Sequence, residues 1–188
     1  MSAGPLEKLL LARSVAFGDF VLASGQRSSY YIDARKTTMS AEGQQLIGTL
    51  GLEAIRAKGW HAQAVGGLTM GADPVAYAIA RASLDSPPIL DAFSVRKAAK
   101  EHGTKRRVEG NFEAGMPVVV IEDVITSGGS ALQAIEAVRA EGGIVLGVLA
   151  VVDRLQGGAD AIRNSGFDVV SLTTTSSIGI PPSPAPSR

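Results

Sequence analysis

The stretch VVVIEDVITSGGSALQAIEAV, Val118 to Val138, decides the fold class, because it combines a buried strand, a turn and a helix. Its first four residues are all β-branched and apolar, which is typical of a strand covered on both faces in a parallel sheet. Gly and hydroxyl residues at 126–130 interrupt the apolar run, and a helix is predicted over residues 129–140. A strand that leads through a turn into a helix is the repeating unit of an α/β protein.

The same alternation extends along the rest of the chain. After an N-terminal helix within residues 1–16, β segments are expected at 19–24 and 29–34, with the turn Gly25, Gln26 and Arg27 between them. Further strands are expected at 62–68, 88–95, 117–123, 143–153 and 168–174, and helices at 41–57, 73–82, 129–140 and 159–164. The polar segment 96–110 lacks apolar periodicity and is expected to be a loop. The pattern predicts a central, mostly parallel sheet flanked by helices on both faces.

Composition excludes several classes of protein. Of the 188 residues, 45% are hydrophobic and 19% are charged, which is an ordinary globular balance. Eighteen Lys and Arg match eighteen Asp and Glu, so the chain lacks the net basic charge of a general nucleic-acid-binding protein. The absence of Cys excludes disulfides, thiolate metal sites and a cysteine nucleophile. No apolar run reaches the roughly 20 residues of a membrane span, and Glu7, Lys8 and Arg13 argue against a signal peptide, so we expect a cytoplasmic protein without membrane contact.

Chemically rich loops follow the predicted strands. They are GGLTMGADP at 66–74, RKAAKEHG at 96–103, EDVITSGGS at 122–130 and DRLQGG at 153–158. In an open α/β sheet, ligands bind beyond the carboxyl ends of the strands. We therefore expect these four loops to converge on one crevice.

The loop EDVITSGGS joins two acids to a turn suited to an anion. Backbone N–H groups and hydroxyls at 126–130 can hold a phosphate at the start of the following helix. Neither the P-loop sequence nor a G-x-G-x-x-G fingerprint is present. Glu122 and Asp123 would repel a phosphate but can accept hydrogen bonds from the hydroxyls of a ribose, and they favour positive charge on a sugar carbon. The loop therefore fits a 5-phosphoribosyl group. On its own, TSGGS would fit an ordinary helix N-cap about equally well.

The segment VVVIEDVITSGGSA, 118–131, resembles the phosphoribosyl pyrophosphate (PRPP) motif of the type I phosphoribosyltransferases. Within that group the chain is similar to the orotate phosphoribosyltransferases. FGDFVLASGQRSSYYIDAR, 17–35, resembles their N-terminal hood, although Ala23 and Ser29 stand where many members carry Lys and Pro. Two further segments are similar: RKAAKEHG resembles the family's catalytic loop, and VVDRLQGG resembles its Asp-Arg strand end. VGGLTMGADPVA, 65–76, resembles the pyrophosphate loop, with Met70 where some relatives have Lys.

The resemblance implies a division of the chain and a set of site residues. It implies one domain over residues 1–188, with an N-terminal helix and hood over about 1–35 and a flexible tail over about 179–188. It implies catalytic roles for Lys97, Lys100 and Asp123, and orotate binding by Thr126 and Arg154. It implies PRPP binding by Arg96, Lys97, Lys100, His102, Glu122, Asp123, Val124, Ile125, Thr126, Ser127, Gly128, Gly129 and Ser130. No catalytic role is implied for the hood segment.

The implied reaction is the transfer of 5-phosphoribosyl from PRPP to orotate, a pentosyl transfer in pyrimidine nucleotide synthesis that releases pyrophosphate. Its implied cofactor is Mg²⁺, held mainly by PRPP rather than by protein ligands. Its implied assembly is a homodimer with shared active sites, in which the catalytic loop reaches the pyrophosphate of the neighbouring subunit's site.

Other interpretations of the same pattern are open. A purine or uracil phosphoribosyltransferase would share the PRPP motif, but the hood and Arg154 disfavour it, since a neutral base offers no carboxylate to an arginine. A PRPP-sensing regulator of the same fold that binds nucleic acid is disfavoured by the zero net charge and the retained catalytic loop. Arg154 alone would also fit a surface ion pair with Asp153, RKAAKEHG a solvated charged loop, and Tyr30 and Tyr31 ordinary packing in a β-hairpin.

Overall fold

The computed structural model describes residues 3–21, 27–98 and 106–180. Helices are α1 (Pro5–Ser14), α2 (Arg35–Thr38), α3 (Ala41–Ala57), α4 (Ala72–Leu84), α5 (Gly129–Ala140) and α6 (Gly158–Asn164). Strands are β1 (Val15–Val21), β2 (Arg27–Ile32), β3 (Ala64–Leu68), β4 (Asp91–Val95), β5 (Val108–Gly110), β6 (Pro117–Ile125), β7 (Ile144–Asp153) and β8 (Val169–Thr174). Most predicted elements agree with these bounds to within a few residues, and the helices predicted at 41–57 and 129–140 begin and end where predicted.

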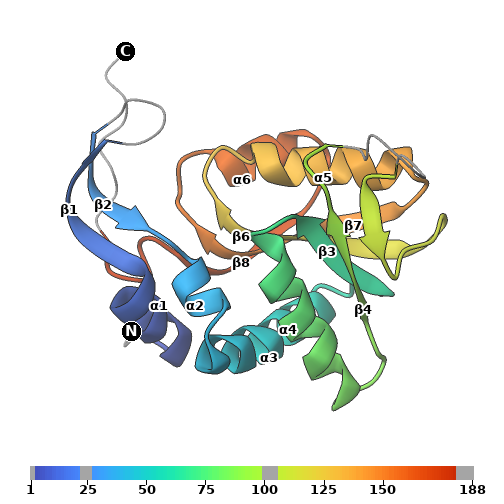
Figure 1. Cartoon of the computed structure of the whole chain (residues 1–188), viewed down its shortest axis with the longest axis horizontal. Helices are drawn as coiled ribbons and strands as arrows, with labels where there is room; N and C mark the ends of the chain where they lie inside the picture. Colours follow the sequence, from blue (N-terminus) through green and yellow to red (C-terminus); the bar gives the residue numbers. More distant parts are fainter. Residues whose placement is uncertain (1–2, 22–26, 99–105, 181–188) are drawn as a thin grey trace.

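The central sheet has the strand order β5-β4-β3-β6-β7-β8. Every neighbouring pair from β4 to β8 is parallel, whereas β5 pairs antiparallel with β4 at one edge. Helices α3 and α4 cover one face of this sheet, and α5 and α6 cover the other (Figure 1). The predicted fold class, an α/β protein with a mostly parallel sheet between helices, is confirmed.

Strand β6 lies in the middle of the sheet and is buried from both sides. Val119 and Ile121 pack in the core beneath α3 and α4, whereas Val118 and Val120 pack against α5. All four side chains are 0% exposed. The uninterrupted β-branched run is therefore explained by a strand that has no solvent-facing side.

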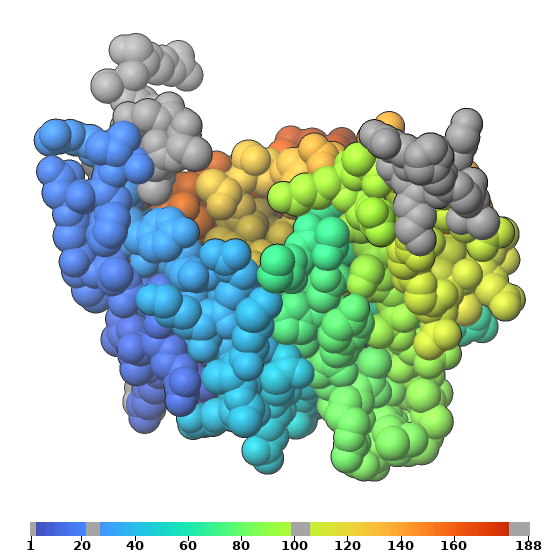
Figure 2. Space-filling model, in the orientation of Figure 1, coloured from blue at the N-terminus to red at the C-terminus, as the bar shows by residue number. Residues whose placement is uncertain are grey.

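The N-terminal hairpin forms a sheet of its own. Strands β1 and β2 pair antiparallel, and the hairpin projects at one end of the molecule beside α1 and α2 (blue in Figures 1 and 2). The predicted hairpin boundaries are wrong. Strand β1 begins at Val15 rather than at residue 19, and Arg27 does not belong to a turn but starts β2, where it pairs with Val21 of β1. Strand β1 is exposed along most of its length, so no apolar alternation marks its start.

Two short elements were not predicted from the sequence, and most of the predicted tail lies outside the described residues. The end of the segment predicted as a loop at 96–110 forms β5, in which Val108 is buried but whose three residues are too few for a periodic pattern. Asp33 and Ala34, predicted at the end of a strand, instead precede the short helix α2. Residues 181–188 of the predicted flexible tail lie outside the described part of the chain. Among the residues that the structure describes, no helix has the length and apolar character to cross a membrane.

Candidate active site

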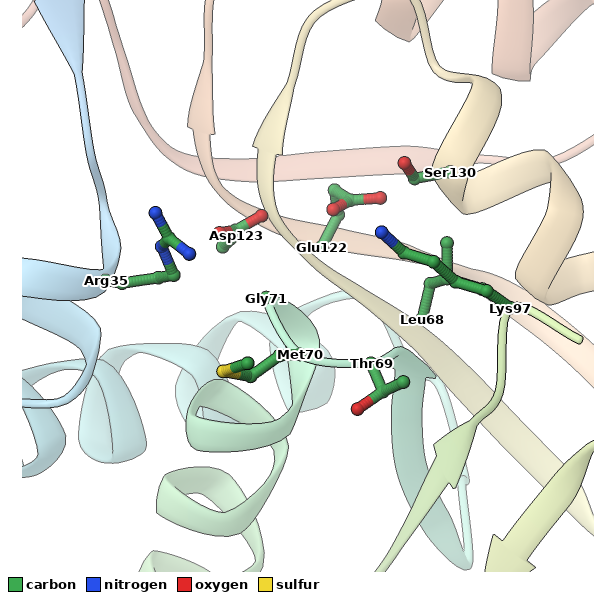
Figure 3. A pocket seen from close by; sticks show the side chains of 9 residues that line it. All are labelled: Arg35, Leu68, Thr69, Met70, Gly71, Lys97, Glu122, Asp123 and Ser130. Atoms are coloured by element: carbon green, nitrogen blue, oxygen red, sulfur yellow. The ribbon is translucent and has the colours of Figure 1, made fainter.

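The strand order creates a crevice at the carboxyl ends of β3 and β6. The chain continues from β3 to β4 on one side of the sheet and later returns to β6 on the other side of β3, so these two strands flank a topological switch point. A cavity of about 440 Å³ opens there (Figure 3). Its lining residues are Arg35, Leu68, Thr69, Met70, Gly71, Lys97, Glu122, Asp123 and Ser130. Three of the four loops that the sequence analysis singled out therefore meet in one pocket.

The two acids occupy the end of β6 and face this pocket (Figure 3). Glu122 is 7% exposed, and its burial, together with the neighbouring charge of Asp123, raises the pKa of Glu122 to about 9. The raised pKa favours the neutral, protonated form of Glu122. Asp123 is half-buried, and one of its oxygens accepts a hydrogen bond from the N–H of Val124 at 2.8 Å.

The turn after the acids surrounds a second, smaller cavity of about 70 Å³, lined by Glu122 and by Val124, Ile125, Thr126, Ser127, Gly128, Gly129 and Ser130. Gly128 precedes α5 with φ 82° and provides no side-chain cap. A Cβ at Gly128 would lie 2.7 Å from the carbonyl oxygen of Gly158, so only glycine fits. An ordinary Ser or Thr cap is thereby excluded, and the first N–H groups of α5 face a ligand-sized space.

The β3–α4 loop lies against the acids. A Cβ at Gly71 would be 2.7–2.8 Å from the carboxylate of Asp123, so this glycine lets the loop and the acid approach each other. The Thr69 hydroxyl donates to Asp73 at 2.6 Å, and the hydroxyl of Ser94 on β4 donates to the other oxygen of Asp73 at 2.7 Å. Asp73 thus ties this loop to the strand that leads to Lys97.

The cationic loop after β4 is only partly described. Lys97 lines the large pocket, and its ammonium group points toward Glu122 (Figure 3). Arg96 turns toward β5, where it forms an exposed ion pair with Glu109 at 3.7 Å. Lys100 and His102, together with Ala23 of the hood segment, lie outside the described residues.

Arg154 follows β7 and points toward the hairpin. Its N–H donates to the carbonyl of Ile125 at 3.0 Å, and its guanidinium lies 5.2 Å from the centre of the Tyr30 ring. Its Nε and Nη2 are buried and have no hydrogen-bond partner within the described residues. Asp153, the alternative partner, instead accepts a hydrogen bond from the N–H of Leu155 at 2.8 Å. Buried donors normally have acceptors, and Arg154 lacks them among the described residues for two of its nitrogens, so its planar fork could pair with a planar anionic group. Arg154 does not line the large pocket, and Asp153, Leu155 and Gly157 line a separate cavity, so the fourth loop does not join the other three in the crevice as predicted.

Comparison with known proteins identifies the family, although no family model matches the sequence. The orotate phosphoribosyltransferase of Rhodopirellula baltica is 43% identical over 182 residues, which are 95% of this chain and 94% of that protein. The Aquifex aeolicus orotate phosphoribosyltransferase is 47% identical over 89% of this chain and 92% of its own. The chain belongs to the orotate phosphoribosyltransferase family.

Solved structures of orotate phosphoribosyltransferases support the same assignment. The Mycobacterium tuberculosis orotate phosphoribosyltransferase in complex with Fe(III) dicitrate superposes with a TM-score of 0.84 at 43% identity, covering 93% of this chain and 97% of that one. The same enzyme in complex with PRPP superposes with a TM-score of 0.80 at 39% identity and the same coverage. The resemblance found in the sequence, and the type I phosphoribosyltransferase fold that it implied, are confirmed.

One pocket residue, Arg35, was not predicted from the sequence. Arg35 lines the large cavity from the start of α2, on the side opposite Lys97 (Figure 3). It ends the segment that resembles the hood, to which no site role was given. The sequence shows only that Asp33 and Arg35 are close enough to form an ion pair, which the structure confirms at 2.8 Å. This spacing does not place Arg35 in the pocket, because α2 reaches the pocket only through tertiary packing.

Proposed function

We propose that the crevice between β3 and β6 transfers 5-phosphoribosyl from PRPP to N1 of orotate, giving orotidine 5′-monophosphate and pyrophosphate. The observation that carries this proposal is the junction of the two cavities at Glu122. The larger cavity contains both acids, and the smaller one is lined by the Gly and hydroxyl turn. This arrangement supports a ligand that has sugar hydroxyls at one point and a phosphate a few ångströms away.

Ribose and 5′-phosphate are assigned to the β6 end. Asp123 accepts hydrogen bonds from the ribose hydroxyls, while protonated Glu122 can both donate and accept. The N–H groups and hydroxyls of 126–130 bind the 5′-phosphate, which the positive end of the α5 dipole also stabilises. The loop 68–71 presents backbone to the pyrophosphate.

Pyrophosphate and orotate are assigned to the cationic side chains. Lys97 binds the pyrophosphate within the described pocket. Arg96, Lys100 and His102 are proposed to reach the pyrophosphate of the neighbouring subunit, which makes a homodimer the catalytic unit. Arg154, with its unsatisfied Nε and Nη2, takes the carboxylate of orotate, and Thr126 helps to orient the base.

The chemistry needs positioning and charge rather than a covalent nucleophile. As the bond from C1 of ribose to pyrophosphate breaks, positive charge develops on the sugar, and Asp123 beside it stabilises that charge. Holding the two anions on either side of C1 aligns N1 of orotate for attack. If bound, Mg²⁺ would be held mainly by PRPP and would supply positive charge that offsets the charge of the pyrophosphate; the carboxylate oxygens of Asp123 are of the hard type that this ion prefers. A cytoplasmic location completes the proposal, since both substrates are small and water-soluble.

A subunit-mixing experiment tests the shared site. Lys100→Ala and Arg154→Ala are each expected to be nearly inactive, because each homodimer then lacks a pyrophosphate or an orotate contact at both sites. In a hybrid dimer, one site combines intact Arg154 from one chain with intact Lys100 from the other. Half of the dimers in an equal, fully exchanged mixture are hybrids with one good site, so recovered activity reaches at most about a quarter of that of the unmodified protein.

The control uses differently tagged chains, so that hybrid dimers are purified before the assay. Recovered activity in those hybrids supports a loop that acts across the subunit boundary. Verified hybrids without activity rule it out, and a loop that serves its own subunit gives two inactive variants without rescue. Full activity of Lys100→Ala alone would mean that the loop is only a solvated surface segment.

A further inference from the structure

Arg35 gives the pocket a second positive wall. It starts α2, directly after the hairpin, and its guanidinium points toward Asp123 above Met70 and Gly71 (Figure 3). Lys97 approaches from the opposite end of the cavity. Of the residues that line the cavity, these two carry the positive side chains.

The Arg35 side chain is anchored in a way that leaves its outer donors available. Its Nε donates to Oδ1 of Asp33 at 2.8 Å, and its backbone N–H reaches the same oxygen at 3.3 Å. The same contact holds the pKa of Asp33 below its usual value. The terminal nitrogens of Arg35 make no hydrogen bond to any residue within 3–21, 27–98 or 106–180. Anchoring through Nε fixes the plane of the fork and presents its outer edge to the pocket.

The ligand that this position fits is a polyanion. The loop below Arg35 consists of Leu68, Thr69, Met70 and Gly71, which contribute no cationic side chain. A diphosphate lying on that loop would also be close to the charge of Asp123, which repels it. A guanidinium beside Asp123 offsets this repulsion and matches the paired oxygens of a phosphate group.

We propose that Arg35 binds the diphosphate group of PRPP from the hairpin side, through its two terminal nitrogens. This assignment rests on the proposed function, because it takes the PRPP pocket as given. It differs from a role in binding orotate, whose carboxylate is assigned to Arg154. It also gives the hairpin a direct part in holding the leaving group.

Calorimetric titration of the full-length protein in magnesium buffer tests the proposal, with PRPP, pyrophosphate and ribose 5-phosphate as probes. In Arg35→Ala, the Kd values for PRPP and pyrophosphate should rise about 10- to 100-fold, as expected for the loss of a charge-assisted contact. The Kd for ribose 5-phosphate, which lacks the diphosphate, should change less than about twofold. Asp33→Asn keeps the guanidinium but loosens it, so it should weaken pyrophosphate binding less than Arg35→Ala does.

Arg27→Ala is the matched control. Arg27 is also an arginine of the hairpin, it pairs with Asp19 at 3.6 Å, and it does not line the pocket, so its removal should leave all three Kd values unchanged. Thermal unfolding of each variant establishes that it is folded, and Arg35→Lys, which keeps the charge without the fork, supplies a second folded test with an intermediate loss.

Two results would overturn the assignment. Unchanged pyrophosphate binding in Arg35→Ala would remove the contact altogether. Equal weakening of ribose 5-phosphate binding would mean that Arg35 acts through the sugar site. If the unmodified protein binds neither PRPP nor ribose 5-phosphate, the proposed function itself fails. If the unmodified protein and Arg35→Ala bind PRPP and pyrophosphate equally well, only the role of Arg35 is contradicted.

Discussion

The two sides of the pocket are formed by different kinds of chain segment. On one side, β6 and the turn after it place two acids, a phosphate-sized cavity and a helix start within residues 118–130. On the other side, the β1–β2 hairpin and α2 bring Arg35 to the same space from residues 15–38. The first side is contiguous in sequence and rooted in the core, whereas the second is an exposed hairpin followed by a short helix.

The difference shows where site chemistry is encoded locally and where it depends on packing. A strand buried on both faces fixes the direction of the residues that follow it, so Glu122 and Asp123 can be assigned to a crevice from the sequence. No buried strand fixes the position of Arg35, because that position depends on how α2 packs beside α1 and α3. If this contrast is right, substitutions on the β6 side should impair the sugar site directly, whereas substitutions that leave activity unchanged should be easy to find on the hairpin.

Of the changes that test this comparison, Asp123→Asn is expected to reduce turnover most. The change keeps the shape of the side chain but removes the charge that holds the ribose and stabilises the developing cation. We expect kcat/KM for PRPP to fall about 10- to 100-fold, corresponding to about 1.5–3 kcal/mol, with little change in Tm. Asp19→Asn, in a hairpin carboxylate outside the pocket, should behave like the unmodified protein. Steady-state kinetics at varied PRPP checks both, and an Asp123→Asn variant with unchanged kcat/KM would remove Asp123 from the mechanism.

A smaller loss is expected for Gly71→Ala. Gly71 has φ −64°, which alanine adopts without strain, but the new Cβ would lie 2.7–2.8 Å from the Asp123 carboxylate and displace it. We expect kcat/KM for PRPP to fall about tenfold, since a displaced contact costs less than a lost one. The double variant with Asp123→Asn should lose little more than Asp123→Asn alone, because both changes act on the same contact. Strictly additive losses would show that Gly71 acts elsewhere.

What the sequence could predict follows the same division. The central parallel sheet, the bounds of α3 and α5, and the meeting of the β3, β4 and β6 loops all follow from apolar periodicity and parallel-strand topology. The sequence does not predict the start of β1, the pairing of Arg27, or β5. An exposed strand or a strand of three residues buries too little apolar surface to leave a periodic pattern. The pairing of Arg154 with the Tyr30 ring, and the entry of Arg35 into the pocket, require tertiary contacts between segments far apart in sequence.

A separate effect, on stability rather than on turnover, is expected at Glu122. Burial raises the pKa of Glu122 to about 9, whereas in the unfolded chain this carboxyl titrates near its ordinary pKa of 4.5. The folded protein therefore holds a proton that the unfolded chain releases, and its stability should fall as pH rises through that window, by up to about 1.4 kcal/mol per pH unit. Glu122→Gln should lack this contribution. Urea unfolding of both proteins at pH 5 and pH 8 measures it, and identical pH dependence would mean that Glu122 is charged in the folded state.

The most direct measurement of the central claim is turnover of the unmodified protein with PRPP, Mg²⁺ and one base at a time. The unsatisfied donors of Arg154 beside the hairpin call for a base that carries a carboxylate. We predict orotidine 5′-monophosphate and pyrophosphate with orotate, and no nucleotide with adenine, hypoxanthine or uracil. Product with any of those three bases but none with orotate would contradict the account.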